Sequence, residues 1–185
     1  MDIKLLRHRL DVMSCLDEIM TPENKAWLRM FTKGEVNNYK WYLMDNGAGD
    51  VFKVIFHDIG VVLKGFDHEN ELNQFAADEW DYTFFENMFR GIPKELYDLF
   101  TEQERDKTTF CMWYLNATGK WYENAYDGND GGKSFLLRYI RGNVEDFIEW
   151  ASDYYEEDFN RDVMEKLFND AILTDEEKDN LIIRN

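Results

Sequence analysis

The chain has 185 residues and a formal net charge of -17 at pH 7, because 38 acidic residues outweigh 21 basic ones. Such an excess of negative charge repels phosphate backbones, so direct nucleic-acid binding is not expected and a basic partner is favoured. Hydrophobic residues make up 44% and aromatic residues 16% of the chain, which supplies a core and excludes a disordered protein. We predict one globular domain over residues 1–185.

Neither a secretion signal nor a membrane span is expected. The first residues interleave charged and apolar side chains, and no later apolar run is long enough to cross a bilayer. The two cysteines, Cys15 in a helical pattern and Cys111 in a strand pattern, fit buried thiols in a reducing compartment better than a disulfide. A cytoplasmic bacterial protein is therefore predicted.

Helices are expected at the N-terminus. Apolar residues recur with helical spacing between residues 3 and 19. Thr21 followed by Pro22 is typical of an N-cap and the first helical position, which predicts a second helix through Phe31 that ends at Gly34.

The middle of the chain predicts strands. Three strands separated by turns rich in Gly, Asn and Asp are expected over residues 39–44, 51–56 and 61–66. Residues 108–115 are apolar on both faces, which predicts a central strand, and a turn then leads to a strand over residues 120–125. The predicted fold class is α+β, with about five antiparallel strands, flanking helices and a helical C-terminal region.

The periodicity changes at a corner formed by residues 65–69. Strand-like residues precede the corner, and Leu72, Phe75 and Ala76 follow it with the spacing of a helix. Asp67 is well placed to cap this helix, because its carboxylate can accept the N–H group of residue 69 or 70. The first interpretation of the corner is therefore a capped connection between a strand and a helix.

The same corner allows a second interpretation. Asp67, His68 and Glu69 bring a histidine next to two carboxylates, and such a histidine can act as a general base or a metal ligand. This alternative makes the chain a small-molecule hydrolase or ligand-binding domain. His57 would lie at the opposite end of the hairpin, about 25 Å from His68, and no Cys or His pair has zinc spacing. No metal and no cofactor are predicted.

The loop of residues 127–132 resembles two known motifs and fits neither. It ends in Gly132-Lys133-Ser134 before an apolar segment, as a phosphate-binding loop does, but Asp127 occupies the position of the required first glycine. It also fails as a calcium-binding EF-hand loop, since Gly131 and Arg138 occupy ligand positions five and twelve. A turn is predicted, with a weak cation site in the loop as the alternative.

The chain after residue 142 is helical and strongly acidic. Asn143 can cap a helix, and Thr174 with Glu177 forms the capping box of the last one. Residues 143–185 contain 14 acids and 4 bases, a difference of -10 within the total of -17. A solvated helical face is the simplest interpretation of such a charge run.

Four short motifs resemble an uncharacterised family of bacterial proteins. They are KGFDHE at residues 64–69, GIP at 91–93, TFCMW at 109–113 and WASDYYE at 150–156. The likeness spans most of the chain after about residue 50. Two positions depart from the family: Asn70 stands where Ser is typical, and Asp81 follows Trp80 where Pro is typical. The resemblance implies a grouping by fold and no activity.

The main functional prediction is binding to a basic protein, with enzymatic activity less expected. Aromatic anchors surrounded by complementary charge provide both hot spots and fast association, and the acidic C-terminal region combines the two. The predicted contact residues are Glu145, Glu149, Trp150, Tyr154, Tyr155 and Glu156. The most concrete form of this prediction is an immunity protein that neutralises a toxin such as a basic nuclease.

Overall fold

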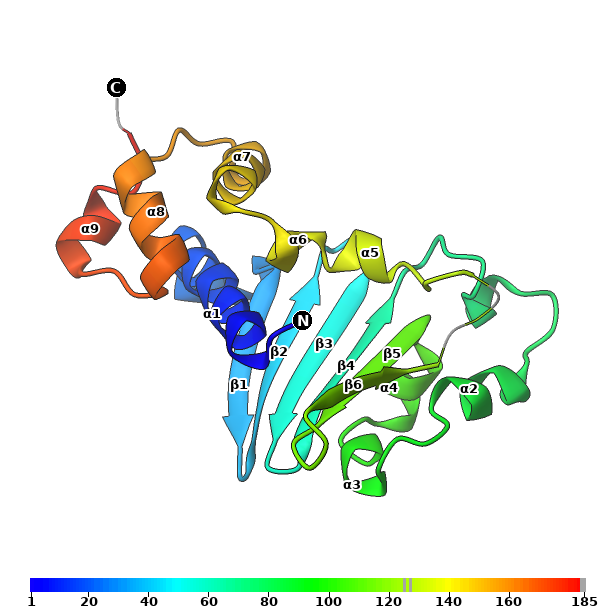
Figure 1. The fold of residues 1–185 in the computed structure, drawn as a ribbon. Coiled ribbons are helices and arrows are strands. Elements are labelled where there is room, and N and C mark those ends of the chain that lie inside the picture. Colours follow the sequence, from blue (N-terminus) through cyan, green and yellow to red (C-terminus); the bar gives the residue numbers. More distant parts are fainter. Residues whose placement is uncertain (125, 127, 184–185) are drawn as a thin grey trace. The chain divides into compact units, whose positions relative to one another are not determined.

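The computed structural model describes residues 1–124, 126 and 128–183. The chain divides into two compact units (Figure 1). One unit, called the sheet unit below, contains Thr32–Leu136, and the other, the helical unit, contains residues 1–31 and the chain from Leu137 onward. The single domain over residues 1–185 stays a prediction.

The predicted α+β class is confirmed, because the described strands form one antiparallel sheet with helices beside it (Figure 1). The sheet has six strands rather than five, in the order β1-β2-β3-β4-β5-β6. The strands are β1 (Phe31–Val36), β2 (Tyr39–Asp45), β3 (Val51–His57), β4 (Gly60–Phe66), β5 (Phe110–Leu115) and β6 (Lys120–Glu123). Each strand pairs antiparallel with its neighbours in sequence, through short turns except between β4 and β5.

The additional strand, β1, replaces a predicted helix. Pro22 precedes only a short 3-10 helix, η1 (Glu23–Leu28), and Phe31 and Gly34 lie in the strand that follows. A Cβ atom at Gly34 would lie 2.5 Å from the indole ring of Trp41, so the glycine is needed for the close approach of a neighbouring side chain. The helix prediction was wrong because this glycine makes room for a ring and does not end a helix.

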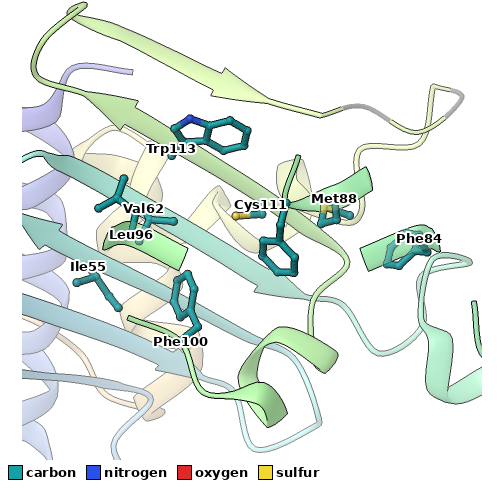
Figure 2. Close-up of a cluster of buried hydrophobic side chains, with 9 residues drawn as sticks. Ile55, Val62, Phe84, Met88, Leu96, Phe100, Cys111 and Trp113 are labelled. Carbon is teal, nitrogen blue, oxygen red and sulfur yellow. The ribbon is translucent and has the colours of Figure 1, made fainter. Parts of the chain in front are cut away.

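One hydrophobic cluster of the sheet unit lies on one face of the sheet (Figure 2). The chain between β4 and β5 forms α2 (Tyr82–Met88), α3 (Lys94–Tyr97) and α4 (Glu102–Asp106). The buried residues of this cluster are Ile55, Val62, Cys111 and Trp113 from the strands and Phe84, Met88, Phe89, Leu96 and Phe100 from the connection. Burial of these side chains stabilises the unit by about 2 kcal/mol each.

The helix predicted directly after the corner does not form. Residues 67–73 make turns, and η2 (Gln74–Ala76) is a single 3-10 turn. The side chains of Asn70 and Asn73 each accept the backbone N–H group two residues further on, at 3.0 Å. Such local bonds compete with helix formation. Phe75 is 57% exposed, so the helical spacing marks no buried face.

The helical unit contains α1 (Ile3–Met20), α6 (Arg138–Arg141), α7 (Val144–Tyr155), α8 (Arg161–Asp170) and α9 (Asp175–Asp179). Both predicted caps are confirmed: Asn143 forms a capping box with Asp146 before α7, and Thr174 forms one with Glu177 before α9. Helix α1 packs against α6 and α8, and α7 packs against α8. In the part of the chain that the structure describes, no helix combines the length and the apolar character needed to cross a membrane.

Candidate functional site

The corner after β4 brings His68 to the carboxylate of Asp50, which precedes β3. Nδ1 of His68 lies 2.7 Å from Oδ1 of Asp50, and the backbone N–H group of His68 donates to the same oxygen at 3.0 Å. The second carboxylate oxygen accepts the side-chain amide of Asn46 at 2.8 Å. The side chain of Asp50 is 6% exposed and that of His68 is 40% exposed. A buried acid therefore orients an accessible imidazole.

Hydrogen bonding sets the charges of this pair. The bond to Asp50 raises the pKa of His68 above its ordinary value of 6.5. Burial acts to raise the pKa of Asp50, but the bonds from His68 and Asn46 outweigh burial and lower it. Both shifts favour the charged forms, because each group is stabilised by its partner.

Asp67 caps the corner, as predicted, although it caps a turn rather than a helix. Its Oδ1 atom accepts the N–H group of Glu69 at 3.1 Å. Its own N–H group donates to Oγ1 of Thr109, and that hydroxyl donates to the carbonyl of Gly131 at 2.6 Å. Gly132 has φ +83, and a Cβ atom there would lie 2.3 Å from Oδ2 of Asp67. The glycine loop therefore lies directly against the capping carboxylate.

Asp50, Asp67 and His68 each offer one ligand atom, and these atoms lie within 4.8 Å of one another. Carboxylates and imidazole together suit several divalent cations. The Oδ1 atom of Asp50 already accepts two bonds from His68, however, and the carboxylate of Glu69 is 84% exposed, 3.8 Å from Nε2 of His68. The arrangement fits a hydrogen-bonded His-Asp pair better than a ligand set.

The loop after residue 126 leads into a short helix. Asp127 lies outside the described residues. It is the residue that occupies the position of the first glycine of a phosphate-binding loop. Oδ2 of Asp130 accepts the N–H group of Ser134 at 2.9 Å, at the start of α5 (Lys133–Leu136). The ammonium group of Lys133 forms an ion pair with Glu123 at 2.5 Å. The lysine that would contact a phosphate in such a loop is therefore bound to a carboxylate.

The six predicted partner-binding residues lie on α7 and at its C-cap, Glu156, which has φ 56. Glu145, Glu149 and Glu156 are spaced by four and seven residues and form an exposed stripe, while Phe147 and Ala151 are buried on the opposite side. The helix therefore separates an acidic face from a packed face.

The three aromatic residues of α7 differ in exposure. Tyr154 is 42% exposed and stacks on Trp150, with ring centroids 5.4 Å apart and an interplanar angle of 17°. Trp150 is half-buried and contacts Phe31 and Phe147. Tyr155 is also half-buried, and its ring lies against Trp150. The ring of Tyr154 is therefore exposed and contacts the rings of Trp150 and Tyr155.

The hydroxyl of Tyr155 is committed to a buried acid. It donates to Oδ1 of Asp17 at 2.9 Å, and Oδ2 of the same carboxylate accepts the N–H group of Phe31 at 2.6 Å. Asp17 is fully buried, and burial raises its pKa to about 6 although these hydrogen bonds act to lower it. This pair ties the C-terminal end of α7 to α1.

The acids of α7 differ in their partners. Glu145 forms an ion pair with Arg161 at 2.5 Å, and Arg161 also contacts Glu165 at 2.7 Å. Within the described residues, the exposed side chains of Glu149 and Glu156 form no ion pair. Their charge therefore remains available to a partner, as does that of Asp153, another exposed acid of α7 with no ion pair among the described residues.

The comparisons with known proteins return no match: no family model, no curated protein and no solved structure matches the chain. The resemblance to an uncharacterised bacterial family rests on its four short motifs.

Proposed function

We propose that the chain is a protein-binding module that binds a basic protein partner through the exposed face of α7. The observation that carries this proposal is the exposed ring of Tyr154, held by stacking on Trp150, on the same helix as the exposed carboxylate of Glu149, which forms no ion pair within the described residues. A ring that is already positioned loses little conformational entropy when a partner covers it. Glu156 extends the acidic stripe at the end of the helix.

Charge supports the same role. The net charge of -17 attracts a basic protein at long range, and this attraction increases the association rate at low salt. Exposed carboxylates at the rim of an interface affect mainly the association rate, whereas a buried aromatic anchor affects mainly dissociation. Glu149 and Glu156 are proposed to steer the partner, and Tyr154 to retain it. Trp150 and Tyr155 support the anchor, and Glu145 contributes less because Arg161 neutralises it.

In its most concrete form, the module is an immunity protein of the bacterial cytoplasm that neutralises a basic nuclease. A nuclease binds phosphate backbones through basic side chains, and a stripe of carboxylates presents those side chains with complementary charge. Covering the basic cleft would block the nucleic acid without any chemistry by the immunity protein.

The test begins with capture of partners from the source cell by the tagged full-length chain, identified by mass spectrometry. The association rate of any specific complex is then measured over a range of salt concentrations. We expect the rate to fall steeply with ionic strength, and the triple variant Glu149→Lys, Asp153→Lys and Glu156→Lys to slow association by about tenfold or more. Tyr154→Ala is expected to accelerate dissociation.

A matched control separates the face of α7 from the overall charge. Glu71→Lys, Asp78→Lys and Glu79→Lys change the net charge equally, and these three residues are exposed in the sheet unit. The control variant should slow association much less than the α7 variant. Equal slowing by both variants, or a captured partner that is not basic, would remove the α7 proposal.

The pair of Asp50 and His68 favours a second candidate, a small-molecule hydrolase or ligand-binding site at the corner. With Nδ1 bonded to Asp50 at 2.7 Å, the Nε2 atom of His68, 3.8 Å from the exposed carboxylate of Glu69, is the position for a general base. A screen of activated ester and phosphate substrates tests this candidate. Activity lost in His68→Gln and kept in His57→Gln would support it, and no turnover of any substrate would leave the binding role alone.

A further inference from the structure

A lysine is buried within the sheet. Lys64 is 3% exposed in β4, where every other residue is apolar or glycine. Its Nζ atom donates to the carbonyl oxygen of Lys107, the C-cap residue of α4, at 2.5 Å. An ammonium group has three N–H donors, and this carbonyl is the one acceptor found for them within the described residues. The charge is therefore buried with fewer bonds than it can make, which is costly.

The strand register places a second lysine beside the first. Lys53 of β3 lies directly opposite Lys64, and Leu43 of β2 lies opposite Lys53. Like charges directly opposite each other on one face of a sheet are unfavourable. Glu104 pairs directly with Lys53, because its Oε1 atom accepts from Nζ of Lys53 at 2.5 Å, and its charge also attracts Lys64.

A cavity of about 220 Å³ lies over this row of side chains, between the sheet and α4. It is lined by Leu43, Val51, Lys53, Lys64, Thr101, Gln103, Glu104 and Lys107. Three lysines and one glutamate give the cavity a formal charge of +2, within a chain whose net charge is -17. The cavity therefore concentrates positive charge where the rest of the molecule is negative.

We propose that this cavity binds a small organic anion, whose carboxylate or phosphate group lies against the ammonium groups of Lys53, Lys64 and Lys107. An oxyanion offers the acceptors that Lys64 lacks and relieves the repulsion between the two facing lysines. Leu43 and Val51 contact the apolar part of the ligand. Burial lowers the pKa of Lys64 to about 8, although the negative charge of Glu104 acts to raise it.

The proposal is independent of the face of α7, because every residue of the cavity belongs to the sheet unit. A lysine that serves only to hold the end of α4 would also explain the bond to Lys107. An anion-binding lysine and a lysine that only holds the end of α4 differ in one measurable property. Only the first predicts that an added anion binds in the cavity.

The test is calorimetric titration of the full chain near neutral pH, with sodium butyrate and inorganic phosphate as separate probes. Sodium chloride keeps the ionic strength constant. We expect saturable binding of at least one probe in the millimolar range or tighter, with affinity reduced about tenfold or more in Lys64→Met and Lys53→Met, since each loses a charge-assisted bond. Saturation with butyrate alone, or with phosphate alone, identifies the anionic group.

Lys120→Met is the control, because Lys120 is an exposed lysine of β6 outside the cavity. Its affinity should equal that of the unchanged chain. If Lys64→Met does not fold, Lys107→Met tests the same cavity through an exposed side chain. No saturable binding of either probe, or equal affinity in the cavity variants and the control, would overturn the proposal.

Discussion

Asp17 of the helical unit and Lys64 of the sheet unit are both buried charged residues, but they differ in how their bonds are completed. Each oxygen of Asp17 accepts one short hydrogen bond, from Phe31 and from Tyr155, and the group is fully buried. Lys64 has one described acceptor and faces a cavity. A buried charge with complete bonding serves the fold, whereas one with incomplete bonding beside a cavity indicates a ligand.

The largest expected loss of stability follows from replacing Asp17, the buried acid whose two oxygens both accept hydrogen bonds. Asp17→Ala leaves the N–H group of Phe31 and the hydroxyl of Tyr155 without acceptors, so we expect the free energy of unfolding to fall by about 3 kcal/mol. Urea denaturation measures this loss. Asp153→Ala, an exposed acid of α7, is the control and should be nearly neutral. A similar loss in both variants would contradict the role given to Asp17.

Lys64→Met should behave differently, because it removes a charge whose burial is costly and keeps a side chain of similar length. We expect a change in unfolding free energy within about 1 kcal/mol near neutral pH. The folded pKa, about 8, lies below the ordinary value of 10.5, so the unfolded chain binds more protons between these values. Stability from this group therefore rises with pH across that window.

Urea titrations of the unchanged chain and Lys64→Met at several pH values between 8 and 10.5 measure this difference. The stability of the unchanged chain should rise relative to that of the variant as the pH increases. A difference that stays constant with pH would contradict the burial of an ammonium group at this position.

The pair of Asp50 and His68 is expected to have a smaller effect, limited to acidic and neutral pH. The raised pKa of His68 stabilises the fold below its ordinary value of 6.5, and this contribution is lost as the pH rises through the folded pKa. The lowered pKa of Asp50 stabilises the fold above its ordinary value of 3.8, and this contribution is lost as the pH falls through the folded pKa. Stability from the pair should therefore be greatest between 3.8 and 6.5.

Urea denaturation of His68→Gln across this pH range tests the pair. The variant should lose stability relative to the unchanged chain mainly inside the window, and His57→Gln serves as the control. An equal loss at all pH values would mean that the imidazole contributes by packing alone.

The smallest expected effect on stability belongs to the outward ring of α7. Tyr154 is 42% exposed, so Tyr154→Ala should lower the free energy of unfolding by less than about 1 kcal/mol. Trp150→Ala should cost more, because Trp150 lies against Phe31 and Phe147. Thermal denaturation compares the two variants. A larger loss for Tyr154→Ala would show that its ring serves the fold, and would weaken its assignment as an anchor.

Prediction from sequence succeeded where local patterns decide the structure. The strands β2 to β6 and the caps at Asn143 and Thr174 follow from alternation, turn residues and capping patterns close together in the chain. It failed at β1 and after the corner, where local patterns point to helices. There Trp41 occupies the space above Gly34, and the side chain of Asn70 bonds its own turn.

The candidate sites were harder to predict because strand pairing assembles them. Asp50 and His68 are 18 residues apart and meet because β3 and β4 form a hairpin. Thr109, the residue before β5, contributes the hydroxyl that accepts the N–H group of Asp67. A signal for the cavity was present in the sequence, since Lys64 interrupts an otherwise apolar strand.

The connection between β4 and β5 has a consequence for the order of folding. Strands β1 to β4 are joined by short turns, so their pairing closes small loops and costs little conformational entropy. β5 pairs with β4 only after the whole segment from Asp67 to Thr109 has been enclosed. Because distant contacts form slowly, we expect a hairpin array first and the docking of β5 later. Helix α4 lies in the late segment, so the lysine cavity becomes complete only at the end of folding.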